Sequence, residues 1–299
     1  MELHTREWGR GETLIALHPL ALESSAFEGL AVSLAKRGKR TVAIDLPGFG
    51  RTPAPRGPLT PAVLAAPVVE FAQGLDPPPM ILGVSLGARV ALEAVLRAPE
   101  AFRSAIVISP YLPWKRRRQL LGYARYIDPE RAEKLPIERI WPLLRGLAEG
   151  VQRIPYVRDD AILRAGVRLI YYASCPATRA SILSAARELA LEPAFGPEGF
   201  WPRLATLRVP TAFVWGEKDR LVPYAFAPHV LRTLPHALHR VVRCCGHAPY
   251  GAHDRCLVHA VESALGELEA TAAPPGAAPG ASSVNPQGFV PAPCLVGLS

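Results

Sequence analysis

The sequence of 299 residues lacks any run of about 18 apolar residues that is free of charge and proline, so it contains no candidate transmembrane helix. Its first residues, MELHTREWGRGE, have neither the basic nor the apolar region of a secretory signal. Cysteine is scarce and shows no C-x-x-C pair or zinc-like spacing; the five are Cys175, Cys244, Cys245, Cys256 and Cys294. We therefore expect a soluble, cytoplasmic protein with reduced thiols, no metal and no membrane insertion.

A concentrated basic surface is also missing, although the formal net charge is +8. The one dense basic cluster runs from Lys115 to Arg118, and no stripe of interleaved basic and aromatic residues accompanies it. This distribution argues against a nucleic-acid partner. An acidic carrier or coenzyme remains open as the substrate, and the composition leaves the oligomeric state open.

What the sequence does contain is a series of short, β-branched apolar runs separated by helical patterns. The runs are TLIALH (13–18), TVAID (41–45), MILGV (80–84), SAIVIS (104–109), TAFVWG (211–216) and RVVRCC (240–245). Because they are apolar on both alternating faces, they suit parallel strands covered by helices on both sides. Helical patterns at 25–38 and 60–74, the second with Thr60 as a predicted N-cap, complete an α/β fold.

The alternation of strands and helices is interrupted between residues 110 and 203. Helical patterns follow one another there, at 116–127, 137–152, 159–174 and 178–191. We therefore predict a sheet domain formed by residues 1–109 and 204–269, with residues 110–203 as a helical insertion. Residues 270–299 are rich in Pro, Gly and Ala, and we expect this tail to be disordered.

Ser85 lies in the pentapeptide GVSLG, where an apolar run meets a helical pattern. Gly83 and Gly87 remove side chains that would collide in so tight a turn, so we expect the serine in a strained conformation above the C-terminal edge of the sheet. The helix that follows directs the Leu86 N–H and a positive dipole end towards the same point. This context favours a nucleophilic Ser85 over a serine that only forms a turn.

A serine hydroxyl needs a base to take its proton, and the base is usually a histidine held by a carboxylate. Asp219 and His247 each follow one of the last two strand-like runs. Because loops after parallel strands open on one edge of a sheet, both side chains can reach Ser85. The alternative place for the acid, after the run at 104–109, has no nearby carboxylate.

Over residues 4–268 the chain resembles α/β-hydrolases of the single-domain esterase, lactonase and C–C hydrolase group. The resemblance rests on LHPL, IDLPGFGRT, GVSLG and the paired segments GEKDRLVP and GHAPY. It implies a mostly parallel sheet of about seven strands flanked by helices, with residues 110–203 as a cap over the site. It also implies an oxyanion hole formed by the backbone N–H groups of Leu20 and Leu86, with Pro19 where the family usually has glycine.

The resulting prediction is a serine hydrolase that cleaves a small or medium carboxylic ester, thioester or lactone through an acyl-enzyme. Its catalytic triad would be Ser85, His247 and Asp219, acting on a small-molecule substrate without a cofactor. A C–C bond hydrolase or an acyltransferase on the same triad is an alternative. A non-catalytic binding protein with the hydrolase fold is an alternative of another class.

Overall fold

The computed structural model describes residues 1–113, 124–136, 174–243, 245–247 and 254–272, with 139–140, 142–143, 146–147, 150 and 172. Its strands are β1 (Thr5–Trp8), β2 (Glu12–Leu17), β3 (Lys39–Ile44), β4 (Met80–Val84), β5 (Ser104–Ile108), β6 (Thr211–Gly216) and β7 (Leu238–Val242). They form a seven-stranded sheet in the order β1-β3-β2-β4-β5-β6-β7. Only β1 pairs antiparallel, and the other pairs within this sheet are parallel. The predicted α/β class and strand number are confirmed.

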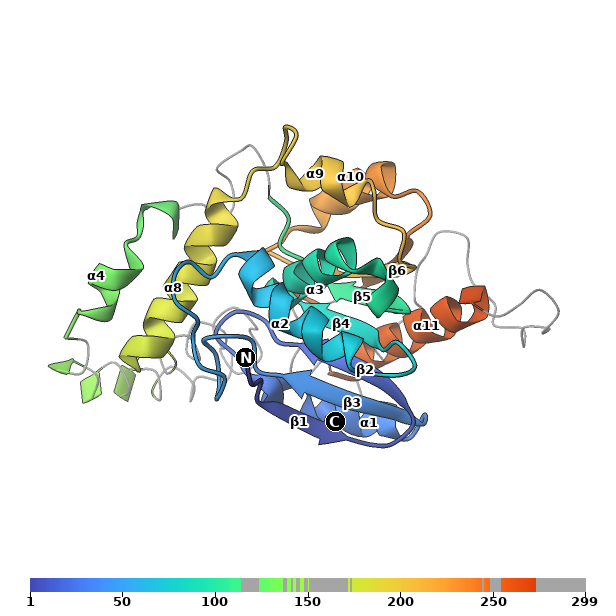
Figure 1. Ribbon diagram of the computed structural model, residues 1–299, viewed down its shortest axis with the longest axis horizontal. Helices are drawn as coiled ribbons and strands as arrows, with labels where there is room; N and C mark the ends of the chain where they lie inside the picture. The colour runs from blue at the N-terminus through green and yellow to red at the C-terminus, as the bar shows by residue number, and fades with distance from the viewer. Residues whose placement is uncertain are drawn as a thin grey trace, which may run out of the picture.

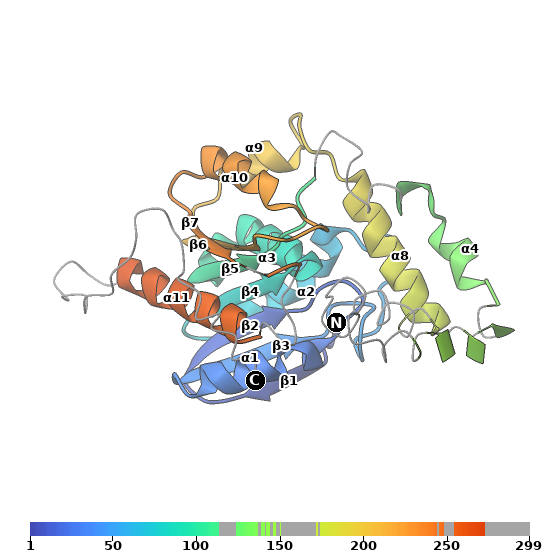
Figure 2. The ribbon, with the colours of Figure 1, turned by 180° about the vertical axis from the view of Figure 1, so that it is seen from behind.

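Helices cover both faces of this sheet, as Figures 1 and 2 show from opposite sides. One face packs against α1 (Glu28–Ala35) and α11 (Asp254–Ala272), and the other against α2 (Pro61–Gln73) and α3 (Leu86–Arg97). The short helices α9 (Phe200–Leu204) and α10 (Ala227–Thr233) lie on the α3 side. The sheet is therefore the middle layer of three, and its strand ends are the places where loops meet.

Alternation along each strand produces these two hydrophobic layers. In β2, Ile15 and Leu17 belong to the cluster on the α2 and α3 side, whereas Leu14 and Ala16 belong to the cluster on the α1 and α11 side. All four side chains are fully buried. Each residue removes apolar surface from water on its own face, which is why the run reads as continuously apolar in the sequence.

The start of α2 follows the predicted capping pattern. The Thr60 hydroxyl accepts a hydrogen bond from the Val63 N–H at 3.2 Å, and Pro61 occupies the first helical position. The side chain satisfies one of the free amides of the first turn, while proline has no amide to leave unpaired. Both features stabilise this end of the helix.

The insertion between β5 and β6 contains the described helices α4 (Pro129–Glu133), α8 (Pro176–Leu191) and α9. In Figure 1, α4 and α8 lie beside the sheet rather than on one of its faces. The Leu59 N–H donates to the Ser184 hydroxyl of α8 at 3.0 Å, which ties this helix to the loop between β3 and α2. Helix α8 therefore reaches the C-terminal edge of the sheet, where Ser85 is expected.

Some predicted boundaries differ from the structure. Strand β7 is displaced towards the N-terminus from the predicted run at 240–245, because Leu238 and His239 pair with β6 although they are only half-buried. Helix α11 continues to Ala272, past the predicted start of the tail. The remaining tail, from 273 to 299, lies outside the described residues, as does all or part of each helical pattern predicted at 116–127, 137–152 and 159–174.

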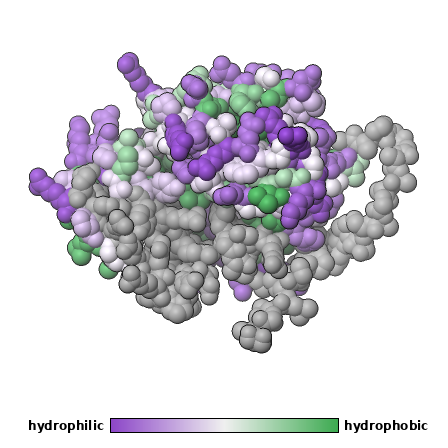
Figure 3. Space-filling model, turned by 90° about the horizontal axis from the view of Figure 1, so that it is seen from below, coloured by the Kyte–Doolittle hydropathy of each residue, from purple (hydrophilic) through white to green (hydrophobic). Residues whose placement is uncertain are grey.

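In the view of Figure 3, the described atoms are mostly hydrophilic, with small separate hydrophobic areas. Among the described residues, none of the helices combines the length and the apolarity that crossing a bilayer would require.

Candidate active site

Ser85 lies between β4 and α3 in a backbone conformation that non-glycine residues rarely adopt, with φ of 55° and ψ of −109°. A Cβ atom added at Gly83 would lie 2.2 Å from the Gly87 carbonyl oxygen, and one added at Gly87 would lie 2.1 Å from the Leu17 carbonyl oxygen. Only glycine fits at both positions. The Ser85 N–H donates to the Ile108 carbonyl of β5 at 2.9 Å, so the surrounding strands hold the strained turn in place.

The three side chains predicted to act together do lie together. Nε2 of His247 is 3.0 Å from the Ser85 hydroxyl oxygen, although the two residues are 162 positions apart. Nδ1 of the same ring is 2.9 Å from Oδ2 of Asp219. Since an ionised carboxylate only accepts hydrogen bonds, the network assigns the ring proton to Nδ1 and leaves Nε2 as an acceptor for the serine hydroxyl.

The Asp219 carboxylate is buried and held from both sides. Its Oδ1 atom accepts hydrogen bonds from the Leu221 and Val222 N–H groups at 2.9 and 2.8 Å, which leaves Oδ2 to the imidazole. The Lys218 N–H donates to the Cys245 carbonyl at 2.8 Å and joins the loops after β6 and β7. These contacts preset the distance between the carboxylate and the histidine.

Leu20 and Leu86 lie in the two loops from which oxyanion donors are expected. The Leu86 N–H is at the first position of α3, where an amide has no acceptor within the helix. The Pro19 carbonyl accepts a hydrogen bond from Nδ1 of His18 at 2.9 Å, and Nε2 of His18 accepts one from the Leu46 N–H at 3.0 Å. Burial lowers the pKa of His18, so the ring is neutral and fixes the loop that carries Leu20.

A buried ion network next to the Ser85 turn was not predicted from the sequence. Arg89, in the first turns of α3, is fully buried and binds Glu93 and Glu192; Glu93 in turn binds Arg203. A signal was present in the string ARVALEAV, where an arginine and a glutamate four residues apart interrupt an otherwise apolar helix. Charged residues at such positions are rarely buried unless they are paired.

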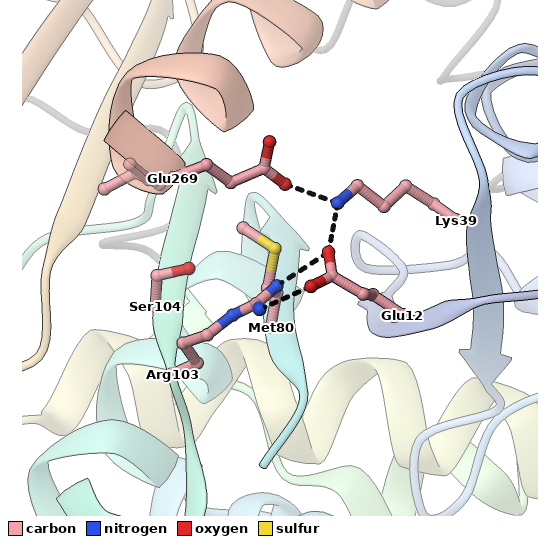
Figure 4. A pocket seen from close by; sticks show the side chains of 7 residues that line it. Glu12, Lys39, Met80, Arg103, Ser104 and Glu269 are labelled. Atoms are coloured by element: carbon pink, nitrogen blue, oxygen red, sulfur yellow. Dashed lines mark hydrogen bonds and ion pairs between the residues drawn. The ribbon is translucent and has the colours of Figure 1, made fainter. Parts of the chain in front are cut away.

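A second charged cluster lies at the opposite, N-terminal edge of the sheet and lines a pocket of about 380 Å³. Figure 4 shows Lys39 between Glu12 and Glu269, and the Arg103 guanidinium against Glu12. Hydrogen bonds from Arg103 and Lys39 lower the pKa of Glu12 to about 2. Since the two cations and two anions bind one another, this pocket has the chemistry of a structural ion cluster rather than of a hydrolytic site.

Comparisons with known proteins agree with this architecture. A family model described as the alpha/beta hydrolase fold matches residues 12–254. The chain is 28% identical over 269 residues to a pimeloyl-acyl-carrier-protein methyl ester esterase of Aeromonas hydrophila, covering 89% of this chain and 100% of that protein. It is 23% identical over 263 residues to a 2-hydroxy-6-oxononadienedioate/2-hydroxy-6-oxononatrienedioate hydrolase of Burkholderia vietnamiensis, covering 83% and 85%. An esterase structure from Thermogutta terrifontis has a TM-score of 0.68 at 19% identity, covering 89% of this chain and 93% of that chain.

The fold class and the resemblance predicted from the sequence are thus confirmed. The esterases among these relatives also support the prediction of an enzyme of the carboxylic ester hydrolase type. The family model spans both the Ser85 turn and the loops after β6 and β7. The chain belongs to the α/β-hydrolase fold family.

Proposed function

We propose that this protein is a serine hydrolase that cleaves carboxylic esters through an acyl-enzyme, with Ser85 as nucleophile, His247 as general base and Asp219 as the carboxylate that orients the base. The observation that carries the proposal is the continuous chain of hydrogen bonds through the two nitrogens of His247. This arrangement activates a hydroxyl that is a weak nucleophile by itself.

In the proposed reaction, Oγ of Ser85 attacks the ester carbonyl carbon while its proton moves to Nε2 of His247. The Leu20 and Leu86 N–H groups stabilise the resulting oxyanion. As the tetrahedral intermediate collapses, His247 gives the proton to the leaving alcohol. Water then repeats the sequence on the acyl-enzyme, releasing the acid and restoring Ser85. Asp219 keeps the ring in the required tautomer and stabilises the imidazolium that forms.

The methyl ester esterases among the relatives suggest a narrower substrate class, a methyl ester of an acyl group attached to a carrier protein. The net charge of +8 and the exposed Arg131 and Lys134 side chains at α4 would suit a carrier that is acidic. Comparing the methyl ester of a carrier-bound acyl group with the free methyl ester tests this class. We expect a higher kcat/KM for the carrier-bound substrate and a preference that weakens as salt rises. Equal kcat/KM values for the two substrates would exclude recognition of a carrier and would indicate an esterase without carrier specificity.

Competition experiments distinguish the alternative reactions that the same triad could catalyse. An added alcohol that diverts the acyl group from water would indicate an acyltransferase, and cleavage of an activated C–C bond in preference to esters would indicate the reaction class of the Burkholderia relative. The free thiol of Cys175 is compatible with the predicted cytoplasmic location.

Ser85→Ala tests the proposed function with p-nitrophenyl esters as substrates. We expect a loss of kcat on the order of 10⁶-fold with an unchanged folding transition, because the triad acts as a unit. Ser109→Ala is a matched control: Ser109 is also buried, has a positive φ of 46° and directly follows the neighbouring strand β5, but its hydroxyl has no hydrogen-bond partner among the described residues. Full activity in Ser85→Ala, or an equal loss of kcat in both variants, would refute the assignment of Ser85 as the nucleophile.

A further inference from the structure

The buried ion network behind Ser85 connects three separate parts of the chain. Arg89 is on α3, Glu192 is the residue that ends α8, and Arg203 is on α9. Nε of Arg89 donates to Oε2 of Glu192 at 2.9 Å, and Nη2 of the same guanidinium contacts the other carboxylate oxygen. The pair is therefore bidentate, the arrangement with the strongest orientational preference for arginine.

The network is balanced in charge, and its members other than Arg203 are largely shielded from solvent. Nη2 of Arg89 also donates to Oε2 of Glu93 at 2.9 Å, and Glu93 accepts from Arg203 through its other oxygen. Two positive and two negative groups face one another, and Arg89 has no solvent exposure. Although burial opposes ionisation of Glu93, the two arginines keep its pKa below the ordinary value. Removing one member would leave the buried network with an unbalanced charge.

The remaining face of the guanidinium is covered by an aromatic ring. The carbon at the centre of the Arg89 guanidinium lies 4.5 Å from the centroid of Phe200, the first residue of α9. Nη1 has no hydrogen-bond partner among the described residues, so stacking on the ring supplies part of its stabilisation. Phe200 and Glu192 bracket the segment by which the insertion returns to the sheet domain.

The same region also fixes the point where the insertion begins. Trp201 of α9 donates from its indole nitrogen to the Pro113 carbonyl at 2.9 Å, which joins the beginning of the insertion to its end. Nearby, the Tyr111 N–H approaches the Ser85 carbonyl at 3.4 Å. Burial and the negative charge of Glu192 raise the pKa of Tyr111 to about 12, which keeps this phenol neutral. Both ends of the insertion are therefore held close to the Ser85 turn.

Arg89 is also coupled to the nucleophile through the backbone. Its N–H donates to the Ser85 carbonyl at 3.0 Å, the first helical hydrogen bond of α3. We propose that Arg89 is a positioning residue that sets the placement of α8 relative to Ser85 by binding Glu192, and so sets the space for the substrate's acyl chain. The inference rests on the proposed hydrolase function, because it assigns the insertion a role in holding an acyl group.

The test uses the full-length protein and the variant Glu192→Gln, which removes the charge on the insertion side and keeps a similar side-chain shape. The matched control is Glu7→Gln, which breaks an exposed ion pair with Arg40 at the sheet edge formed by β1 and β3. Two measurements are made on each: kinetics with p-nitrophenyl acetate and p-nitrophenyl octanoate, and hydrogen exchange of the amides in α8.

We expect Glu192→Gln to raise KM for the octanoate ester by about tenfold and to change kcat for the acetate ester by less than about twofold, since the proposal places only the longer acyl chain against α8. Amides of α8 should exchange faster in this variant, while those of β4 and β5 remain unchanged. The Glu7→Gln control should match the wild type in both measurements.

Variants at position 89 provide a second, independent test of the proposal. Arg89→Met should reproduce the effect of Glu192→Gln in the molecules that fold, and Arg89→Lys should restore part of the octanoate KM because it keeps the charge but loses the bidentate geometry. Unchanged exchange in α8 would overturn the proposal, and so would faster exchange with equal kinetic effects on both esters. If the wild type hydrolyses no ester, the proposed function fails, and the exchange data alone then decide whether Arg89 positions α8.

Discussion

The two edges of the sheet carry polar side chains in opposite arrangements. At the C-terminal edge, Ser85, His247 and Asp219 form a directional chain of hydrogen bonds that ends at a hydroxyl group. At the N-terminal edge, Lys39 is enclosed by two glutamates, so its charge is neutralised in place. The first arrangement ends at the hydroxyl of the proposed nucleophile, whereas the charged groups of the second bind one another.

This difference also appears in the backbone. The C-terminal edge includes positive φ values at the non-glycine residues Ser85 and Ser109, which directly follow the neighbouring strands β4 and β5. Lys39 and Ser104, by contrast, are the first residues of regular strands at the N-terminal edge. Strained turns cost stability and persist only where the surroundings hold them, so they indicate the edge that serves chemistry. Variants at the two edges should therefore separate activity from stability.

The largest expected effect in this comparison comes from Asp219→Asn. The amide keeps the shape of the carboxylate but loses its charge and no longer selects the histidine tautomer, so kcat should fall about 10⁴-fold. The free energy of unfolding should change little, because Oδ1 can still accept the hydrogen bonds from Leu221 and Val222. Steady-state kinetics and denaturant unfolding of the same preparation measure both quantities. A large loss of stability with an unchanged kcat would contradict this prediction, because it would assign Asp219 to stability rather than to activity.

Lys39→Met should have the opposite profile. It leaves Glu12 and Glu269 facing each other without their shared cation, and because both are partly exposed we expect a loss of about 1 to 3 kcal/mol in the free energy of unfolding. The kcat for p-nitrophenyl esters should stay within about twofold of the wild type, because the pocket lies at the other edge. Denaturant midpoints and kinetics check this prediction; a kcat loss larger than the stability loss would contradict it.

The acid response of the N-terminal edge provides a smaller effect. The pKa of Glu12 is lowered from 4.5 to about 2 in the folded protein by hydrogen bonds from Arg103 and Lys39. Its contribution to stability is present above the unfolded pKa and is lost as the pH falls through the folded value. The stability difference between wild type and Glu12→Gln should therefore shrink between about pH 5 and pH 2. A constant difference over that range would show that Glu12 is not held by these cations.

The smallest effect is expected for the exposed pair of Arg40 and Glu7. Arg40→Gln removes a contact of 2.7 Å between side chains that are 35% and 45% exposed. Such pairs are screened by water and salt, so the free energy of unfolding should change by less than about 0.5 kcal/mol and kcat should not change. Thermal and denaturant melts measure this baseline. A loss as large as that of Lys39→Met would mean that burial does not distinguish the two pairs.

Sequence patterns predicted the elements that are determined by residues close together in the chain. The apolar runs that became β4 and β6 were predicted with the observed bounds, because both strands are buried on both faces. The start of β7 was not predicted, because the polar residue His239 interrupts the apolar pattern. Pairing with β6 defines the strand there. The tight turn at Ser85 could be predicted from the pentapeptide GVSLG, because the space around Gly83 and Gly87 excludes any larger side chain.

The partners of Arg89 could not be predicted in the same way. The string ARVALEAV indicates that Arg89 and Glu93 share a helix face, but Glu192 is 103 residues from Arg89. Its placement depends on the path of the whole insertion, which no local periodicity encodes. Asp219 and His247 were predictable at comparable separations only because parallel strands bring the loops that follow them to a common edge.

The most direct test of a nucleophilic Ser85 is mass spectrometry of the intact protein after treatment with a fluorophosphonate, followed by peptide mapping. The account predicts one covalent adduct on Ser85 in the wild type, a much slower reaction in Asp219→Asn, and no adduct in Ser85→Ala. An unlabelled but folded wild type, or an adduct that persists in Ser85→Ala, would contradict it.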